Sequence, residues 1–363
     1  MQKIKVKLAE NSYEIRVGSG ILGQVGGWLK EKGFTGKAVI VTDSYVEGFY
    51  AEPLKKSLSQ AGFSVTILAV PAGEAQKTLE TAGSLYDRLA ESFAERSTLI
   101  IALGGGVIGD LAGFVAATYM RGVPYVQVPT SLLAMVDSSI GGKTAVDRGK
   151  MKNIVGAFYQ PQMVIADIAT LHTLPREELS NGMAEAIKMA AIGDSGFFRF
   201  LEENMKRAIA LDAAVLEKIV IENAVRKAGV VGKDERETGG RIILNYGHTV
   251  GHAVEAVSGF KLKHGEAVAI GMIAENSIAR SRGLLSERQA FRIRQVIGEA
   301  GLPVSIPDFS TGEKERVLEV IKHDKKVFND KVRFVLLKAI GRPVIVDDVD
   351  PALVKEVLYD RAA

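Results

Sequence analysis

Short apolar runs rich in β-branched residues alternate with helical stretches in the first half of the chain. The runs predict strands at 38–42, 64–70, 98–103, 125–128 and 163–166. The N-terminal segment 1–7 also alternates in the manner of a strand. Strands separated by helices in this way indicate a parallel sheet that is covered by helices on both faces.

The pattern changes from about Leu171 onward to longer helical segments. Helices are predicted at 176–191, 213–228, around His248, at 264–282 and at 286–300, with a short hairpin at 332–337 and 343–346. We therefore predict an α/β N-terminal domain with a parallel nucleotide-binding sheet, residues 1–167, and a mainly α-helical C-terminal domain, residues 168–363. Ligands of open α/β sheets bind outside the carboxyl ends of the strands, so the active cleft is expected between the two domains.

The composition is that of a globular protein with a near-neutral charge balance. The 363 residues are 47% hydrophobic and 25% charged, and the formal net charge is +3. This balance gives no reason to expect nucleic acid or a membrane surface as a partner. The sequence has no cysteine, so a metal would be held by imidazole and carboxylate. The N-terminus lacks the apolar core of a signal peptide, and we expect a cytoplasmic protein.

Three histidines lie within seventeen residues: His248, His252 and His264. A lone histidine is usually structural, but three so close together indicate a metal site. His248 and His252 lie one helical turn apart on the same face. Thr249 stands where a zinc peptidase has glutamate, which disfavours hydrolysis of that type.

Glu185 is the best candidate for a carboxylate ligand at such a site. It lies three residues before Lys188 on an apolar helix, so an intrahelical salt bridge is the alternative explanation. Two imidazoles and one carboxylate would leave a zinc ion open to substrate oxygens.

The predicted strand 98–103 runs directly into a glycine-rich turn, Gly104–Asp110, with the Gly-x-Gly-x-x-Gly spacing. Such a turn lets a pyrophosphate approach a helix N-terminus. The motif comes late in the chain and has no acidic residue twenty positions on, so it is a variant of the dinucleotide motif or only a tight turn. Asp43 follows one strand and is a candidate to accept hydrogen bonds from a ribose, and Glu74 and Lys77 offer an acid and a base after the next strand. A helix N-cap is the alternative for Asp43, and a solvated first turn is the alternative for Glu74 and Lys77.

Residues 129–147 are rich in small hydroxylated residues and glycine and are interpreted as a binding loop. A nucleotide P-loop is excluded, because its first glycine would fall at Asp137. Lys143, Lys150, Lys152 and Asn153 are candidate phosphate donors, with a solvated basic loop as the alternative. Lys233, Arg241 and Asn245 bring further polar groups towards His248 and suit a substrate with both phosphate and carboxylate.

Five motifs agree in order and spacing with one known family. They are Gly104–Asp110, Pro129–Thr144, Lys152–Pro161, Gly182–Lys188, and Asn245–His252 together with 264–268. Over about residues 43–326 the sequence strongly resembles the 3-dehydroquinate synthase family, which belongs to the sugar-phosphate cyclases.

The resemblance implies two cofactors. Zinc, with cobalt as a substitute, would be bound by Glu185, His248 and His264, which moves His252 to the substrate side. NAD would contact Asp43, Glu74, Lys77, Gly106, Val107, Ile108, Gly109, Asp110, Thr130, Ser131, Lys143, Lys152, Thr170, Leu171, His172 and Thr173.

The resemblance also implies a substrate site and a reaction. Phosphate and proton-transfer roles fall to Lys143, Lys152, Asn153, Lys188, Asn245 and His252. Substrate contacts fall to Asp137, Lys325 (or Lys326), Lys233 and Arg241, the last two on the carboxylate, with Arg121 reaching over from a second subunit of a homodimer. The implied reaction is that of a phosphate-eliminating lyase: 3-deoxy-D-arabino-heptulosonate 7-phosphate cyclises to 3-dehydroquinate, NAD is reduced and then regenerated, and the substrate's own phosphate is a candidate base.

Three alternatives stay open on the sequence. Another sugar-phosphate cyclase would act on a substrate without the carboxylate and would leave Lys233 and Arg241 without a partner. A metal-dependent polyol dehydrogenase would have no need of the phosphate lysines. A non-catalytic NAD-binding regulator would be expected to have lost some of the metal ligands or lysines, and none is missing.

Overall fold

The computed structural model describes residues 1–149, 151–237, 239–322, 327–328 and 331–360. The chain forms two compact units: one is Met1–Pro175 with Ala213–Arg236, and the other is Arg176–Asp212 with Glu237–Ala363. This division differs from a single cut after residue 167. The helix α8 (Ala213–Lys233) packs against strands β1 and β2 and therefore belongs with the sheet.

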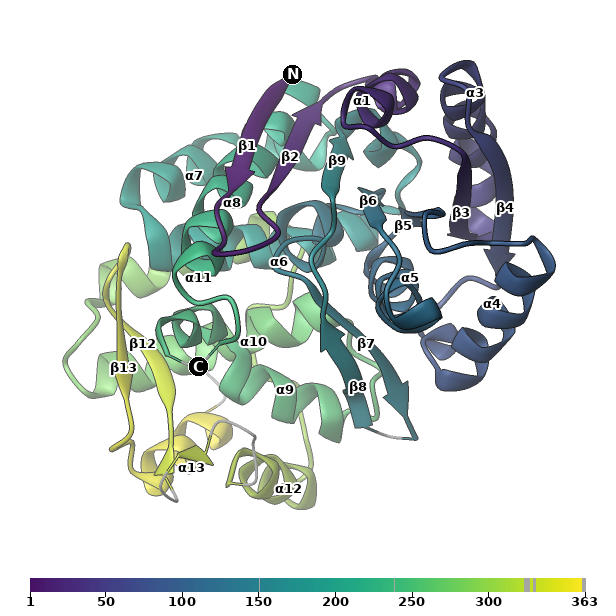
Figure 1. Cartoon of the computed structure of the whole chain (residues 1–363). Coiled ribbons are helices and arrows are strands. Elements are labelled where there is room, and N and C mark those ends of the chain that lie inside the picture. The colour runs from purple at the N-terminus through teal and green to yellow at the C-terminus, as the bar shows by residue number, and fades with distance from the viewer. Residues whose placement is uncertain (150, 238, 323–326, 329–330, 361–363) are drawn as a thin grey trace. The chain divides into compact units, whose positions relative to one another are not determined.

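The first unit is built on a seven-stranded sheet in the order β1-β2-β9-β6-β5-β3-β4 (Figure 1). Neighbouring strands are parallel except for β1 and β2, which pair antiparallel at one edge. The five predicted strands and the N-terminal strand are confirmed, whereas β2 was not predicted. The strands are β1 (Gln2–Val6), β2 (Tyr13–Gly18), β3 (Lys37–Asp43), β4 (Ser64–Val70), β5 (Leu99–Gly104), β6 (Tyr125–Pro129) and β9 (Met163–Asp167).

Alternate residues of the central strands enter two separate cores, one on each face of the sheet. Ile40 and Ile101 pack with helices α1 (Val25–Glu31) and α3 (Glu52–Gln60). Their neighbours Val39 and Ile100 pack with α4 (Leu79–Glu91) and α5 (Gly106–Thr118) on the opposite face. This period of two explains why the strands are apolar throughout: both faces are covered.

The change of helix layer fixes where a ligand is expected on this sheet. The helix that follows β3 lies on one face, and the helices that follow β4 and β5 lie on the other. Since β3 and β5 are neighbours, the strand order reverses between their carboxyl ends. Asp43 and Gly104 stand at those ends, at the point where open α/β sheets bind nucleotides.

The segment 129–147 is not the loop that its composition suggested. It contains the π-helical turn η5 (Ala134–Ser138), whose first three residues are buried, and then strand β7 (Lys143–Arg148). β7 forms an antiparallel hairpin with β8 (Met151–Phe158). The small residues of this segment were mistaken for loop residues, whereas they permit close packing. Thr144 fits against Gly113 of α5, where a Cβ would lie only 2.5 Å from its side chain.

The second unit is mainly helical, as predicted. The predicted helices correspond to α6, α9, α10 and α11 and the predicted hairpin to β12–β13, whereas α7, α12 and α13 were not predicted. The elements are α6 (Arg176–Gly193), α7 (Ser195–Ile209), α9 (His248–Val257), α10 (His264–Ser281), α11 (Glu287–Glu299), α12 (Thr311–Lys322), α13 (Pro351–Tyr359), β10 (Val327–Phe328), β11 (Lys331–Val332), β12 (Phe334–Ala339) and β13 (Arg342–Val346).

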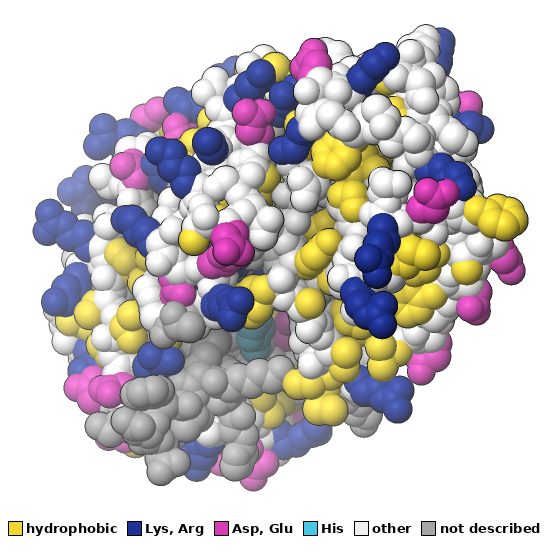
Figure 2. Space-filling model, viewed as in Figure 1, with side chains coloured by type: hydrophobic (Ala, Val, Ile, Leu, Met, Phe, Trp, Pro, Cys, Tyr) yellow, Lys and Arg dark blue, Asp and Glu magenta, His cyan; other side chains and the backbone are white. Residues whose placement is uncertain are grey.

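Two observations concern membranes and nucleic acid, which the charge balance gave no reason to expect as partners. Within the described ranges, no helix combines the length and the apolar character needed to span a membrane. On the face shown in Figure 2, basic side chains are interspersed with acidic ones instead of gathering into one field.

Candidate metal and cofactor sites

Contacts through glycine bring the three helices of the histidine cluster together. A Cβ at Gly271 of α10 would lie 1.8 Å from the carbonyl oxygen of Gly247, and one at Gly251 of α9 would lie 2.7 Å from that of Ala267. The two helices therefore cross almost backbone to backbone. Gly265 makes a similar approach to Asn181 of α6, whose Oδ1 accepts a 2.5 Å hydrogen bond from its amide.

A buried carboxylate of α10 fixes the start of α9. Glu275 accepts hydrogen bonds from the amides of Gly247 at 2.7 Å and Thr249 at 3.2 Å. Gly247 is in the left-handed conformation (φ +79°), which lets the chain turn into the helix at His248. The backbone of His248 is thus held by the neighbouring helix.

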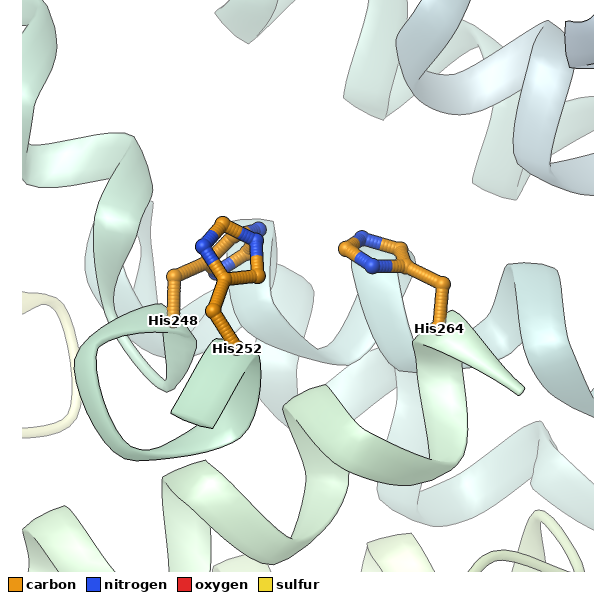
Figure 3. Close-up of side chains that lie close together, drawn as sticks. All are labelled: His248, His252 and His264. Atoms are coloured by element: carbon orange, nitrogen blue, oxygen red, sulfur yellow. The ribbon is translucent and has the colours of Figure 1, made fainter. Parts of the chain in front are cut away.

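The helices bring the histidine side chains to one point. The ligand nitrogens of His248, His252 and His264 all lie within 4.8 Å of one another. Figure 3 shows the rings of His248 and His252, from α9, facing the ring of His264 from the start of α10. Oε1 of Glu185 lies 3.4 Å from Nε2 of His248 and 3.5 Å from Nε2 of His264.

These separations suit a tetrahedral zinc ion. Metal–ligand bonds of about 2.1 Å at tetrahedral angles place the donor atoms about 3.4 Å apart. The outer nitrogens are also satisfied: Nδ1 of His248 donates to the Tyr246 carbonyl at 3.1 Å, and Nδ1 of His264 lies 3.3 Å from Oε2 of Glu255. Partners of this kind orient a metal-binding histidine so that Nε2 faces the ion.

The carboxylate of Glu185 has the environment of a ligand for a cation. Both oxygens are buried and neither accepts a well-aligned hydrogen bond, although Lys188 and both histidines lie at ion-pair distance. Burial alone would raise the pKa of Glu185, but Lys188 and His264 outweigh it and lower the pKa to about 2. The salt bridge that the sequence offered as an alternative is therefore present together with the histidine contacts.

His252 differs from the other two histidines in its exposure. Its side chain is exposed, and its ring centre lies 5.0 Å from that of His248 and 5.8 Å from that of His264. Two alternative sets of metal ligands therefore occupy the same location: the three histidines, and Glu185 with His248 and His264. The exposed edge of His252 suits a group that meets substrate.

In the first unit, the glycine-rich turn opens α5 at the carboxyl end of β5. Cβ atoms at Gly104 and Gly109 would lie 2.7 Å and 2.8 Å from side chains of Ile108 and Gln127, so these glycines permit close packing of helix and strand. Residues 106–110, including Val107, form the first turn of α5, whose unpaired amides favour an anion. Ser131 lies against Gly105, and the Thr130 amide donates to Gly104 at 3.0 Å.

Two predicted NAD contacts and one predicted catalytic residue form a network around the buried Lys77. Nζ of Lys77 donates to Asp110 at 2.6 Å and to Oδ1 of Asn153 at 2.5 Å. Burial by itself would lower the pKa of Lys77, but the neighbouring carboxylate of Asp110 outweighs burial and raises that pKa. The pKa of Asp110 is also raised, because burial of its carboxyl group outweighs the effect of Lys77. Asn153 has a positive φ of 54°, and its backbone N–H donates to Oδ1 of Asp147 at 2.7 Å, which fixes the backbone at this position.

The remaining NAD candidates gather near the carboxyl end of β3. Asp43 caps the helix α2 (Ser44–Val46) by accepting from Tyr45 and Val46, as the alternative explanation proposed. The hydroxyl of Tyr45 in turn donates to the Thr173 carbonyl at 2.7 Å. The short helix η6 (Ile168–Thr173), which carries Thr170, Leu171 and His172, is thereby held beside Asp43.

The predicted anion-binding residues are distributed over both units. In the first unit, three of them are exposed: Lys143 at the start of β7, Lys233 at the end of α8, and Arg121, which has a φ of 67°. Nζ of Lys152 lies 3.8 Å from Oε1 of Glu74. In the second, Lys188 and Arg241 are buried, and Asn245 is half-buried at the end of η7 (Gly240–Asn245). Lys325 and Lys326 lie outside the described residues.

Two residues were missed by the sequence analysis. Lys227 is buried on α8, and its Nζ lies 2.5 Å from Oδ1 of Asp137, a predicted substrate contact. The signal was its helical spacing from Val220, Ala224 and Val231, which places a lysine on an apolar face. Glu255, which contacts His264, is also buried on α9.

Solved structures with the same fold identify the class of protein. The chain matches 2-deoxy-scyllo-inosose synthase complexed with carbaglucose-6-phosphate, NAD⁺ and Co²⁺ with a TM-score of 0.90 and 29% identity, and the match covers 100% of both chains. It also matches 2-epi-5-epi-valiolone synthase from Streptomyces hygroscopicus subsp. jinggangensis with NAD⁺ and Zn²⁺ bound. The TM-score of this match is 0.89, the sequence identity is 27%, and the match covers 98% of each chain. The fold is that of the sugar-phosphate cyclases.

Sequence comparison narrows the class to one family. Residues 67–181 match the 3-dehydroquinate synthase N-terminal domain, and residues 182–327 match the C-terminal domain of the same family. A 3-dehydroquinate synthase of Desulforamulus reducens is 48% identical over 359 residues, covering 99% of both chains. The chain belongs to the 3-dehydroquinate synthase family.

Proposed function

We propose that this chain is a lyase that converts 3-deoxy-D-arabino-heptulosonate 7-phosphate to 3-dehydroquinate with loss of phosphate, using NAD and zinc. The observation that carries the proposal is the convergence of Glu185, His248 and His264 beside the buried cation Lys188. Membership of the family and its curated relatives supports the same reaction.

The donor set fits zinc, with cobalt as a substitute, in number, chemistry and spacing. When bound, the ion would supply Lewis acidity to substrate oxygens, and NAD would accept and return a hydride. Solved relatives of this fold contain NAD⁺ with Co²⁺ or Zn²⁺, which supports both cofactors here.

The protein's own residues would bind the substrate and move its protons. Lys188 would hold phosphate oxygens near Glu185, and exposed His252 would exchange protons at the open edge of the cluster. Buried Lys77, which also pairs with Asp110, would hold the side-chain amide of Asn153 in one orientation towards the substrate. Arg241, which is buried, would bind the carboxylate, with Lys233 as the partner that the family resemblance implies.

A cytoplasmic location and a homodimer belong to the same proposal. Arg121 lies on the exposed turn η4 (Tyr119–Arg121), which supports a contact with a second subunit. Analytical ultracentrifugation of the wild type and of Arg121→Ala tests the dimer. If the variant stays dimeric but loses turnover, Arg121 is needed for the reaction and not for assembly.

The direct test is turnover by the purified protein with NAD and zinc. We expect release of one phosphate per heptulosonate phosphate consumed, no net NADH, and 3-dehydroquinate as the product by NMR. Net NADH accumulation would favour a dehydrogenase, and binding of NAD without phosphate release would favour a non-catalytic regulator.

A second test separates this substrate from those of other cyclases. A charge-assisted pair between Arg241 and the carboxylate contributes about 1.5–3 kcal/mol, so Arg241→Ala should lower kcat/KM by roughly 10- to 150-fold. An analogue without the carboxylate should be largely unaffected by the substitution. Equal losses on both substrates would contradict the role given to Arg241, and a wild-type preference for the analogue would contradict the proposed reaction.

A further inference from the structure

A groove that is separate from the histidine cluster lies on the second unit. It has a volume of about 690 Å³ and is formed by helices α10 and α11. This volume is in the range of pockets that hold small molecules. Its chemistry comes mainly from Asn276, Ser277, Arg280, Arg288, Phe291 and Arg294.

The charge of the groove favours an anion. The lining contains three arginines and one carboxylate, Glu287, which lies 3.6 Å from Arg280. Arg288 is exposed on the neighbouring turn and Arg294 is half-buried. Planar guanidinium groups bind carboxylates through two parallel hydrogen bonds, which a single ammonium does not provide.

Asn276 provides a second and independent indication of a ligand. Its side chain is 3% exposed and lines the groove, and its Nδ2 is buried without a hydrogen-bond partner. Its Oδ1 accepts a 2.7 Å hydrogen bond from the hydroxyl of the buried Tyr246, so the amide is held in place. A buried donor left unpaired is costly, and an acceptor in the groove would satisfy it.

The apolar part of the groove favours a ring. Phe291 is 58% exposed although it is a large hydrophobic residue, and Ile273 and Ala290 line the same groove. An aromatic ligand would cover Phe291 by stacking while its acidic group reaches the arginines. We propose that this groove binds a small aromatic carboxylate.

Titration with 4-fluorobenzoate, followed by ¹⁹F NMR on the full-length protein, tests the proposal. We expect saturable binding at one site, and roughly 1.5- to 5-fold weaker binding by Arg288→Gln, the range for loss of one solvent-exposed ion pair. Phe291→Ala and Asn276→Leu should also weaken binding. Both Arg288 and Phe291 are exposed, so their substitution leaves the core intact.

Matched controls locate the site and define the ligand class. Arg316→Gln changes an exposed arginine on α12 outside the groove and should not alter the affinity. Arg241→Ala should also bind 4-fluorobenzoate normally, because the proposed substrate carboxylate site is a different one. The ligand 4-fluorobenzyl alcohol should not bind, and inorganic phosphate should not compete at equal concentration.

Several outcomes would overturn the proposal. They are an absence of saturable binding, equal affinities for the wild type and Arg288→Gln, or loss of binding in Arg241→Ala but not in Arg288→Gln. Effective competition by phosphate together with no effect of Phe291→Ala would show an unspecific anion site. None of these measurements uses turnover, so failure here is distinguishable from failure of the proposed function.

Discussion

Glu255 offers the sharpest test of how the histidine cluster is organised. Its Oε2 lies 3.3 Å from Nδ1 of His264, the nitrogen that faces away from Glu185. The equivalent partner of His248 is the Tyr246 backbone carbonyl, which no side-chain substitution removes. Glu255→Gln therefore removes the charge of one outer partner and keeps its shape.

The expected loss of zinc affinity is about 10- to 100-fold, the usual effect of removing an outer partner of a metal-binding histidine. This corresponds to about 1.4–2.8 kcal/mol. The loss depends on pH, because zinc must displace a proton from His264. Burial lowers the pKa of His264 on its own, but the nearby carboxylates of Glu185 and Glu255 outweigh it and raise the pKa to about 9 in the metal-free protein.

The sign of the pH effect follows from that raised pKa. Below pH 9 the wild type loses apparent zinc affinity by roughly tenfold per unit as His264 becomes protonated, whereas Glu185 with a pKa of about 2 stays ionised. Glu255→Gln lowers the pKa of His264, so proton competition weakens and offsets part of the loss at pH 7. The full loss is expected only near pH 9.5.

Competition with a zinc chelator at pH 7 and pH 9.5 measures both quantities. Glu202→Gln, in a surface pair with Arg292, serves as a control for the same chemical change elsewhere in the unit. Equal zinc affinities of the wild type and Glu255→Gln at pH 9.5, with zinc lost in His264→Ala, would refute the reasoning.

Three further predictions concern the ligands, the helix crossing and the nucleotide end. Purified protein should carry about one zinc, and Glu185→Gln, His248→Ala and His264→Ala should each lose it, whereas His252→Ala should keep zinc and lose turnover; metal analysis showing the reverse for His252 and His264 would contradict the ligand set. Gly271→Ala should destabilise by about 1–3 kcal/mol or more in thermal unfolding, because the new Cβ meets the Gly247 oxygen, whereas Gly229→Ala, with open space around it in α8, should stabilise by about 0.5–1 kcal/mol. Lys77→Met should cost about 3 kcal/mol in urea unfolding by leaving Asp110 without its cation, and Lys77→Met/Asp110→Leu should recover part of that loss; no recovery would mean that the pair is not what stabilises this region.

The sheet could be predicted because its strands are buried on both faces. Runs such as 99–104 are apolar at every position, and no helical spacing competes with that pattern. The hairpin β7–β8 could not be recognised in the same way, since β8 is largely exposed or half-buried and its sequence carries no apolar period. Helix α8 was identified but assigned to the wrong half, because sequence spacing does not reveal which sheet or helix a face packs against.

The candidate metal site was only partly visible in the sequence. The spacing of His248 and His252 predicts that they share a face, and the structure does place them on α9 with their ligand nitrogens near those of His264. Glu185 lies beside His264 because α6 and α10 pack closely through Asn181 and Gly265. This contact joins segments about eighty residues apart, which no local sequence pattern encodes. Lys227 was missed for a related reason: its partner Asp137 lies ninety residues earlier in the chain.

The nearly backbone-to-backbone crossing of α9 and α10 makes zinc content a measure of preparation quality. Metal sites tolerate shifts of only about 0.2 Å in their ligand distances, whereas any side chain at Gly271 would force the helices apart by more than that. Stored, heated or redesigned samples that keep their secondary structure but lose this packing should therefore release zinc first. A bound-metal assay would then report damage to the hydrophobic core earlier than circular dichroism does.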